Sequence, residues 1–381
     1  MFKINKLMKT ILFVLDYYLP HRGGVENVFE NIILRLQKKW YKVIVLTSRY
    51  GNDLKEYEEL LDTKIYRVWK NRIQFMIKSI SLWKRILKQK KIDIIHASTY
   101  GWAIPASILW KKLKIKVILT VHEIFGKLWF KYKWLFGWLV YKIFEKIIFM
   151  KKYDIYHCVS NNTAKELKEN YKVDERKIKV IHNWIDDNFW NIKNVDSKEI
   201  FAVRKKYKRD DKFIFLYFGH AGKSKGIDYL IKALPEVLKL ENVMVVFNII
   251  ESKRSKKILN KLRLLRTLQW QRNIQVFNGF SKKDLRNLVA SCDCVIAPSI
   301  SEWFGSVHTE SVAMWKTIIT TKTSAIPEVI WWKVKFIKPW SVSDIINATK
   351  DVLKWNYEKI PEKKFDWDKS VEKIEKLYFI D

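Results

Sequence analysis

The chain has 381 residues, of which 48% are hydrophobic, so it is long enough for two domains with packed cores. Its 73 lysines and arginines exceed its 40 aspartates and glutamates, which gives a formal net charge of +33. That excess is compatible with anionic partners such as nucleic acid, a membrane surface or a phosphate-bearing substrate. The three cysteines exclude a disulfide framework and fit a reducing compartment. No apolar run reaches the roughly 18 residues that span a bilayer, so no transmembrane helix is expected.

Short apolar runs alternate with helical patterns along the chain, which favours parallel sheets with helical crossovers. The expected strands form two series: Ile11–Leu15, Val43–Leu46, Ile92–His96, Lys116–Val121 and Tyr156–Val159, then Phe213–Phe218, Val243–Ile249, Ile274–Phe277, Val295–Pro298 and Thr317–Thr320. We therefore predict an α/β protein with two Rossmann-like, doubly wound parallel-sheet domains. The expected boundaries are 1–190 for the first domain, 191–212 for a linker and 213–365 for the second domain. A final helix within 366–381 is expected to pack back on the first domain.

Two glutamates follow an expected strand of the second domain, at the edge where ligands bind in open α/β sheets. Glu302 lies in the loop after the strand, and Glu310 lies inside the helix that Gly305 opens. The amides of Gly305, Ser306 and Val307 favour an anion, whereas carboxylates repel one and accept hydrogen bonds from hydroxyl groups. The alternative is a pair of solvated glutamates at a helix start.

A glycine-rich basic loop follows the first strand of the second domain. It includes Gly219, His220, Lys223, Lys225 and Gly226. Backbone amides, glycines and ammonium groups together are typical of a phosphate-binding loop, although the spacing is not that of a Walker loop. A solvated basic turn is the alternative.

Polar residues of the first domain also follow expected strands. Gly23 and Gly24 come after the first strand, where paired glycines let the backbone approach a ligand closely. His122 ends another strand, and Ser160 and Asn183 follow later ones. Each also has a structural interpretation: a tight turn, a packed histidine, or polar turn residues.

These motifs resemble those of the GT-B glycosyltransferases, in particular glycosyltransferase family 4. The matching patterns are P-x-x-GG-x-E from Pro20 to Glu26, G-R-x-x-x-x-K-G from Gly219 to Gly226, and two glutamates separated by seven residues. The resemblance runs from Ile11 to about Asp344. It implies two Rossmann-like domains facing across a cleft and retaining transfer of a sugar from a nucleotide diphosphate sugar, without a cofactor.

The resemblance also implies residue roles. The catalytic group comprises His122 at the donor sugar, Lys225 at the diphosphate and Glu302 at the donor sugar. The other residues are implied in donor binding (Gly24, His220, Lys223, Gly305, Ser306, Val307 and Glu310, the last on the ribose) and in the acceptor side of the cleft (Gly23, Ser160 and Asn183). His220 departs from the family pattern, because it replaces an always-charged arginine with a group that titrates near neutrality. This departure puts full activity, or its pH range, in doubt.

The segment Lys127–Lys152 is aromatic, aliphatic and basic at helical spacing. Lys142, Glu145 and Lys146 interrupt its apolar run, so it suits a helix lying on an anionic membrane surface. A buried helix with lysines at its edge is the alternative. With the membrane interpretation, we expect a cytoplasmic protein on the inner face of the cytoplasmic membrane. Its acceptor would be a glycan or a lipid-linked sugar in cell-envelope polysaccharide or glycolipid synthesis.

The chain has 18 tryptophans but only 11 glycines, which is well under the usual glycine share of about 7%. Several tryptophans stand where turn chemistry favours glycine: Trp40, Trp184, Trp303, Trp315, Trp331, Trp332 and Trp340. One hypothesis is that UGA codons meaning glycine have been translated as tryptophan. The other is a genuinely tryptophan-rich protein.

Two further functions stay open at this stage. One is a degenerate, noncatalytic GT-B protein, which the histidine at 220 favours. The other is a basic nucleic-acid-binding protein, although no nucleic-acid module is present and none is expected as a partner. The only Asp-x-Asp, Asp366–Asp368, precedes the last expected helix, so we interpret it as a helix cap and expect no obligatory metal.

Overall fold

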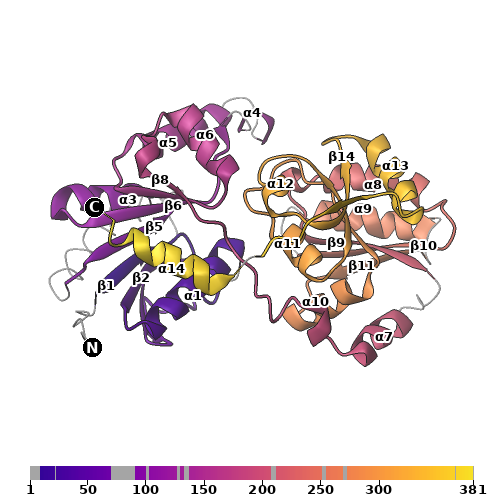
Figure 1. Ribbon diagram of the computed structural model, residues 1–381, viewed down its shortest axis with the longest axis horizontal. Helices are drawn as coiled ribbons and strands as arrows, with labels where there is room; N and C mark the ends of the chain where they lie inside the picture. The colour runs from indigo at the N-terminus through magenta and orange to yellow at the C-terminus, as the bar shows by residue number, and fades with distance from the viewer. Residues whose placement is uncertain are drawn as a thin grey trace. The chain divides into compact units, whose positions relative to one another are not determined.

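The computed structural model describes residues 9–21, 23–69, 91–99, 103–126, 129–132, 137–206, 212–250, 255–268, 273–364 and 366–380. The chain divides into two compact units. Unit 1 comprises Met1–Trp184 and Asp366–Asp381, and unit 2 comprises Ile185–Phe365. Each unit contains one sheet, and both sheets are mainly parallel (Figure 1). The predicted pair of doubly wound α/β domains is therefore confirmed.

The sheet of unit 1 has eight strands in the order β3-β4-β2-β1-β5-β6-β7-β8. All neighbours pair in parallel except β3 and β4, which form an antiparallel edge. The bounds are β1 Thr10–Val14, β2 Lys42–Arg49, β3 Tyr57–Leu60, β4 Thr63–Trp69, β5 Ile94–Ser98, β6 Lys116–Val121, β7 Ile155–Cys158 and β8 Ile178–Val180. Because β1 and β5 are fully buried, their apolar side chains supply core on both faces of the sheet.

Helices cover both faces of this sheet. On one face, α1 (Gly24–Lys38) and α14 (Trp367–Leu377) share an apolar core with β1 and β2. On the other face lie helices α3 (Ala103–Leu113), α5 (Gly137–Met150) and α6 (Asn161–Tyr171), with the short α4 (Trp129–Tyr132) before α5.

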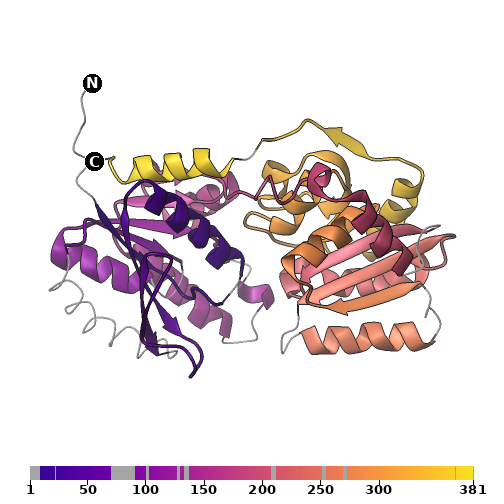
Figure 2. The same cartoon turned by 90° about the horizontal axis from the view of Figure 1, so that it is seen from below.

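The C-terminal helix α14 lies along α1 (Figures 1 and 2). Arg35 on α1 pairs with Asp368 at 2.7 Å, and Lys39 just after α1 pairs with Glu375 at 2.6 Å. Asp366 caps the helix by accepting from the backbone amides of Asp368 and Lys369. The interpretation of Asp366–Asp368 as a helix start is therefore confirmed, and the chain returns to unit 1 through this helix.

The sheet of unit 2 has seven strands in the order β11-β10-β9-β12-β13-β14-β15, with only β15 antiparallel. The strand bounds are β9 Phe213–His220, β10 Val243–Ile250, β11 Ile274–Asn278, β12 Cys294–Ala297, β13 Thr317–Thr321, β14 Trp332–Ile337 and β15 Glu358–Ile360. The helices are α7 Ser197–Lys206, α8 Ile227–Val237, α9 Ser255–Leu268, α10 Lys282–Ser291, α11 Ser306–Ala313, α12 Ile326–Val329 and α13 Val342–Leu353. The strand order reverses between β9 and β12, which makes the loops after these two strands the expected ligand site.

The segment that we expected to be a linker, 191–212, is structured in its described part and belongs to unit 2. Helix α7 packs beside α10, where Asn287 donates to Glu199 at 3.0 Å. Arg204 donates from Nη1 to the carbonyl of Ser291 at 2.7 Å. The division between the units accordingly falls between Trp184 and Ile185 rather than at residue 190.

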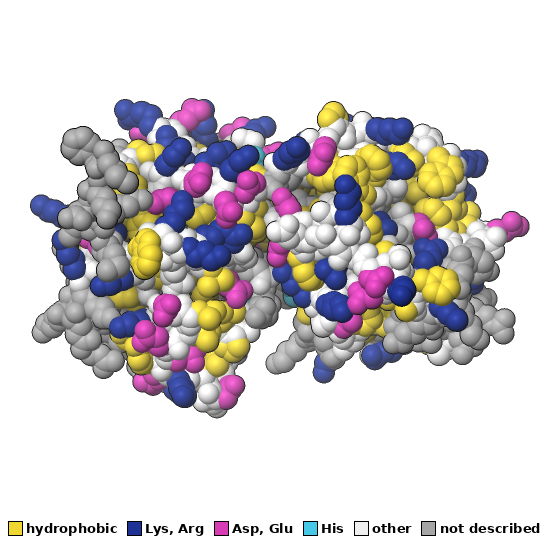
Figure 3. All heavy atoms as spheres, turned by 60° about the horizontal axis from the view of Figure 1, so that its bottom comes forward, with side chains coloured by type: hydrophobic (Ala, Val, Ile, Leu, Met, Phe, Trp, Pro, Cys, Tyr) yellow, Lys and Arg dark blue, Asp and Glu magenta, His cyan; other side chains and the backbone are white. Residues whose placement is uncertain are grey.

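Within the described part of the chain, no helix is both long enough and apolar enough to cross a membrane. On the face shown in Figure 3, lysine and arginine side chains lie among acidic ones rather than in one continuous basic stripe. This face therefore does not show the continuous basic stripe that is typical of a nucleic-acid-binding surface.

Candidate active site

The strongest candidate site lies at the carboxyl ends of β9 and β12, where the strand order of unit 2 reverses. The loop after β9 contains the basic residues Lys223 and Lys225, and the loop after β12 contains Glu302. Backbone hydrogen bonds hold the two loops together, because the amides of Ile300 and Ser301 both donate to the carbonyl of Ser224, at 2.7 and 3.3 Å.

Gly226 makes this close approach possible. Its φ is +66°, in the left-handed region, and a Cβ at this position would lie 1.9 Å from the carbonyl oxygen of Pro298. Any other residue would therefore force the two loops apart. Gly226 also ends the short 3-10 turn Lys223–Lys225 and begins α8, so the glycine in the sequence motif has a direct steric reason.

Lys225 and Glu302 form the charged centre of the site. The Lys225 ammonium donates to both carboxylate oxygens of Glu302 at 2.8 Å, and the Ser299 hydroxyl donates to Oε1 at 2.8 Å. The Glu302 side chain is 5% exposed and that of Lys225 is 26% exposed. Burial is the largest single effect and acts to raise the pKa of Glu302. The charge of Lys225, the hydrogen bonds from Lys225 and Ser299 and the interaction with His308 together outweigh burial and hold that pKa below its ordinary value. An ammonium has three N–H donors, so Lys225 retains capacity for a further acceptor.

The N-terminus of α11 borders this pair. Gly305 has a φ of +85°, and a Cβ there would lie 2.8 Å from Nδ1 of His308. His308 is the first residue of α11 whose amide donates to a backbone carbonyl, that of Gly305. The amides of Ser306 and Val307 precede it, at the end of the helix that favours negative charge.

His308 is a buried residue of this site that the sequence analysis did not single out. Its Nε2 lies 2.8 Å from the Thr320 hydroxyl, and its Nδ1 has no hydrogen-bond partner among the described residues. Burial lowers the pKa of His308 to about 4, so the ring is neutral near pH 7. The only signal for His308 in the sequence was its position as a polar residue within a helix expected to pack on a buried strand. That signal is too weak to indicate a site residue.

Glu310 differs from Glu302 in its electrostatic environment. Burial raises the pKa of Glu310 to about 8, with a small opposing effect from Lys282. Near pH 7, the site therefore combines an ionised Glu302 with a largely protonated Glu310. Two carboxyl groups with opposite shifts can take different roles, as is typical of catalytic and binding sites.

His220 and Lys223 lie at the outer side of the glycine-rich loop, with exposed side chains. The carbonyl of His220 accepts from the Tyr217 hydroxyl at 3.0 Å, which fixes the end of β9. The structure thus brings Lys225, Glu302 and the α11 N-terminus together, with His220 and Lys223 on the solvent side.

The corresponding edge of unit 1 contains the paired glycines. Gly23 is the N-cap of α1, and a Cβ there would lie 2.4 Å from an oxygen of Glu26, whereas a Cβ on Gly24 would meet no atom within 4 Å. Glu26 is buried and lies 3.4 Å from the ring of His21. Burial raises the pKa of Glu26, with His21 opposing that effect. Gly23 therefore lets a buried carboxyl fold back over the helix start, and Gly24 leaves open space.

His122 follows β6 at the same edge of the unit 1 sheet. It is 7% exposed, and its Nε2 has no hydrogen-bond partner in the described part of the chain. Burial, helped by His157, lowers the pKa of His122 to about 3. Its ring packs against that of Phe29, with centroids 5.6 Å apart. Packing alone does not explain a neutral ring with an unpartnered buried nitrogen, and such a nitrogen can contact a ligand.

Ser160 and Asn183 occupy different structural settings in unit 1. Ser160 is the N-cap of α6, where its hydroxyl accepts from the Thr163 amide at 3.1 Å, so this residue has a helix-capping role. Asn183 is 9% exposed and follows β8, next to the point where the chain passes into unit 2.

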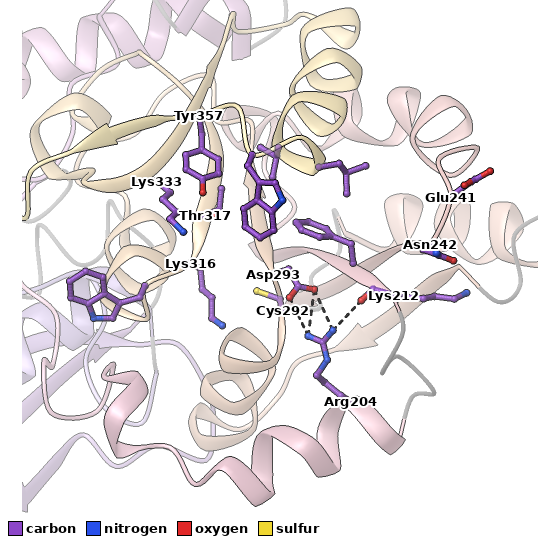
Figure 4. Close-up of a pocket in the computed structure, with 15 residues that line it drawn as sticks. Arg204, Lys212, Glu241, Asn242, Cys292, Asp293, Lys316, Thr317, Lys333 and Tyr357 are labelled. Atoms are coloured by element: carbon purple, nitrogen blue, oxygen red, sulfur yellow. Dashed lines mark hydrogen bonds and ion pairs between the residues drawn. The ribbon is translucent and has the colours of Figure 1, made fainter.

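A cavity of about 570 Å³ lies at the opposite, amino edge of the unit 2 sheet (Figure 4). Arg204, Asp293 and Lys316 line it, and the Arg204 guanidinium is held by the carboxylate of Asp293 at 3.3 Å. Two indoles, those of Trp315 and Trp355, also line this cavity. The cavity contains none of the motif residues described above.

Comparison with known proteins gives the family. A model described as Glycosyltransferase Family 4 matches residues 22–189, and a model described as Glycosyl transferases group 1 matches residues 199–377. An uncharacterized glycosyltransferase of Methanocaldococcus jannaschii is 25% identical over 98% of this chain and 98% of its own length. The phosphatidylinositol N-acetylglucosaminyltransferase GPI3 subunit of Saccharomyces cerevisiae is 21% identical, over 90% of this chain and 75% of that protein.

Solved structures show the same fold. The Anabaena protein HepE in complex with UDP and glucose superposes with a TM-score of 0.77, at 16% identity, over 98% of this chain and all of that chain. A glycosyltransferase from Rickettsia africae gives a TM-score of 0.75 at 22% identity, over 98% of both chains. Each of these solved structures therefore matches both halves of this chain within a single protein.

Proposed function

We propose that this chain, which belongs to the GT-B glycosyltransferases resembling family 4, is a retaining, metal-independent hexosyltransferase-type enzyme. It would move the sugar of a nucleotide diphosphate sugar to a glycan or a lipid-linked acceptor. Its place would be the cytoplasm, at the inner face of the cytoplasmic membrane, in cell-envelope polysaccharide or glycolipid synthesis. The yeast relative, a phosphatidylinositol N-acetylglucosaminyltransferase subunit, and HepE, which was solved with UDP and glucose, support this class of substrates.

One observation carries the donor-site assignment: the partly buried Lys225–Glu302 pair between a glycine-rich turn and the N-terminus of α11. A leaving diphosphate gains negative charge as the glycosidic bond breaks. Lys225 and the amides of Ser306 and Val307 are preorganised donors for that charge, which is the most effective form of transition-state stabilisation. Because these groups supply the positive charge, we expect the reaction to need no metal.

The two glutamates suit the hydroxyl-bearing parts of the donor. Glu302, held ionised by Lys225, is an acceptor for sugar hydroxyls, and Glu310 suits the ribose. A protonated carboxyl near pH 7 can both donate and accept, which fits a vicinal diol. We assign His122 of unit 1 to the donor sugar from the family resemblance, and its neutral ring offers one donor and one acceptor.

Donor binding and turnover test this proposal. We expect nucleotide diphosphate sugars to raise the melting temperature of the purified protein and Glu310→Ala to weaken that effect. NMR of the transferred product should show the anomeric configuration of the donor, and EDTA should leave the rate unchanged. Inversion of the anomeric centre, or a rate that depends on an added divalent cation, would contradict the corresponding part of the proposal. Donor binding without any transfer or hydrolysis would instead favour the noncatalytic alternative.

A further inference from the structure

The outward face of α5 in unit 1 is apolar although it faces solvent. Five of its residues are large, hydrophobic and at least 42% exposed: Leu139 44%, Val140 64%, Ile143 49%, Ile147 42% and Met150 70%. At 100° per residue these positions fall within one arc of about 100° on the helix. Phe130 of the preceding α4 is 69% exposed as well. We call α4 and α5 with these side chains the α5 face.

Charge on the α5 face has one sign. Lys142 and Lys146 are exposed and lie on one flank of the apolar arc, and Lys151 and Lys152 follow the helix. The one acidic residue of α5, Glu145, is fully buried on the opposite side. A helix with an apolar arc beside basic residues suits the interface of an anionic bilayer, where apolar side chains enter the acyl boundary and lysines meet headgroups.

The inner side of the same helix is tied to the loop that follows His122. The carboxylate of Glu145 accepts from the amides of Phe125 at 2.8 Å and Gly126 at 2.9 Å, and from the indole of Trp129 at 3.2 Å. The hydroxyl of Tyr171 on α6 donates to the same carboxylate at 2.5 Å. A helix that is held this firmly can press against a surface without distorting the fold behind it.

We propose that the α5 face docks this protein on an anionic membrane, with the apolar arc inserted at the interface and the lysines on anionic headgroups. This inference deepens the proposed function by naming the surface that meets the membrane. It does not depend on catalysis, because docking can be measured without any sugar donor.

Co-sedimentation of the full chain with lipid vesicles tests the docking. Vesicles containing phosphatidylglycerol should bind the wild type, and pure phosphatidylcholine vesicles should bind it much more weakly. Val140→Asp with Ile143→Asp should abolish binding, whereas Leu264→Asp, at an equally exposed position of unit 2 (58%), should leave it unchanged. Lys142→Gln and Lys146→Gln should each weaken binding about fivefold, and added salt should weaken it further.

Two outcomes would overturn the docking proposal. One is equal binding of the wild type and the Val140→Asp, Ile143→Asp variant to the anionic vesicles. The other is a dimeric wild type that this variant converts to monomers, because the α5 face would then be an interface between two copies of the chain. Retained nucleotide-sugar binding in either case would show that only the docking proposal, and not the proposed function, had failed.

A second inference rests on backbone geometry and is independent of the first. Five of the eleven non-glycine residues with positive φ in the described part of the chain are tryptophans: Trp40 (69°), Trp315 (57°), Trp332 (75°), Trp340 (64°) and Trp355 (59°). Four of these were among the positions where the sequence indicated glycine, and Trp355 is new. The left-handed region is one that bulky L-residues rarely adopt.

Three of these tryptophans end helices in the same way. After α1, the Trp40 amide donates to Gln37 and the Tyr41 amide to Leu36. After α11, Trp315 donates to Val312 and Lys316 to Ser311, and after α13, Trp355 donates to Val352 and Asn356 to Asp351. Each pair of bonds is the Schellman motif, whose left-handed residue is usually glycine.

The side chains at these three positions contribute little to the cores. Trp40 is 78% exposed, Trp315 is 40% exposed and Trp355 is 68% exposed. The indoles of Trp40 and Trp355 are largely in solvent, so their burial does not offset left-handed strain of roughly 1–2 kcal/mol per residue. Trp315 is partly buried against Trp331 and Trp332 and lies outside the buried core clusters. We infer that the natural protein carries glycine at these three sites, and also at Trp332 and Trp340, because its UGA codons are read as glycine. The backbone gives no such argument for Trp184, Trp303 or Trp331, which are not among the positive-φ residues.

Codons, peptide masses and stability test this inference together. We expect UGA at the five sites and glycine in peptides of the natural protein. In the tryptophan-containing chain, Trp40→Gly and Trp355→Gly should each raise the melting temperature by about 2–4 °C. Trp190→Gly is the control, because Trp190 is 4% exposed in the core of unit 2 and its loss should lower the melting temperature. UGG codons at the five sites, or a melting temperature that falls in Trp355→Gly, would overturn the inference.

Discussion

The two edges of the unit 2 sheet differ in kind. The candidate site lies at the carboxyl edge, whereas the cavity lies at the amino edge. The carboxyl edge of β9 and β12 has a partly buried ion pair, a helix N-terminus and three glycines with positive φ, Gly219, Gly226 and Gly305. The amino edge has the cavity of about 570 Å³, lined in part by Trp315 and Trp355. If those two positions are glycine in the natural protein, the cavity loses two of its walls. In this fold the site is therefore identified by charged and polar groups where the strand order reverses, and not by the volume of a cavity.

The largest expected effect comes from removing the positive charge at the carboxyl edge. Lys225→Ala should lower the transfer rate by about 10²–10³-fold, because one preorganised donor to the leaving group is lost. Lys333→Ala, which removes a lysine that lines the amino-edge cavity, should leave the rate unchanged. Steady-state kinetics with a nucleotide sugar measure both variants. Equal losses in the two variants would contradict the contrast between the edges.

Lys225→Ala also leaves Glu302 buried without its cation, so a folding defect must be separated from a catalytic one. The double variant Lys225→Met, Glu302→Gln removes both charges together and should melt closer to the wild type than Lys225→Ala does. It should still be inactive. A double variant that is both stable and active would show that the ion pair is structural only.

Replacing a glycine at one edge and introducing a glycine at the other should change the free energy of unfolding in opposite directions. Gly226→Ala places a Cβ against the carbonyl of Pro298 at a position with positive φ, and we expect it to destabilise the protein by about 1–3 kcal/mol. Trp355→Gly should stabilise it instead, because it relieves left-handed backbone strain at position 355. Urea denaturation gives both free energies of unfolding. A neutral Gly226→Ala would mean that the two loops can separate at little cost, and it would weaken the assignment of the loop as a rigid phosphate cradle.

The sequence was sufficient to predict the central strands and the carboxyl-edge motifs, because both depend on local signals. β1, β9 and β12 are nearly continuous apolar runs, as buried parallel strands are. The strands that were not predicted are β3, β4, β8, β14 and β15. Of these, the edge strands β3 and β15 are short, polar and exposed. Their pairing depends on neighbours that are distant in sequence rather than on their own pattern.

Other features of the site depend on packing and could not be read from the chain. The sequence suggested Glu302 and Glu310 as a pair of like groups, but their pKa values shift in opposite directions because only Glu302 meets Lys225. Burial of Glu145 beneath four donors was likewise invisible, although the surrounding amphipathic segment was evident. For these two glutamates, the groups packed around each carboxyl set its pKa and hence its charge near pH 7.

The opposite shifts of the two glutamates give a pH-dependent prediction. Glu310 has a pKa of about 8 in the folded protein, and a glutamate in an unfolded chain titrates near its ordinary value of about 4.3. Between these values the folded state binds a proton that the unfolded state does not, so this group makes the free energy of unfolding fall as pH rises. Glu310→Gln removes that dependence, and its stability relative to the wild type should increase from about pH 5 to pH 8.

Thermal melts of Glu310→Gln and wild type across this pH range measure the difference. Glu236→Gln is the matched control, because that carboxylate is 53% exposed on α8 and pairs with Lys239 at the surface. Its difference from the wild type should stay nearly constant over the same range. A constant difference for Glu310→Gln as well would show that Glu310 is ionised near pH 7, and the two glutamates would then be electrostatically alike.

The smallest effect on the transfer rate should come from Ser299, whose hydroxyl donates to Glu302 at 2.8 Å from the loop after β12. Ser299→Ala leaves both bonds from Lys225 in place, so the Glu302 carboxylate keeps its charge and most of its orientation. Loss of one hydrogen bond to a charged group should cost about 1.5–3 kcal/mol of stability if no water replaces it, and less if one does. The transfer rate should fall only a few-fold, because no group that meets the leaving diphosphate is removed. A loss as large as that of Lys225→Ala would mean that the exact placement of Glu302, more than the charge of Lys225, limits catalysis at this edge of the sheet.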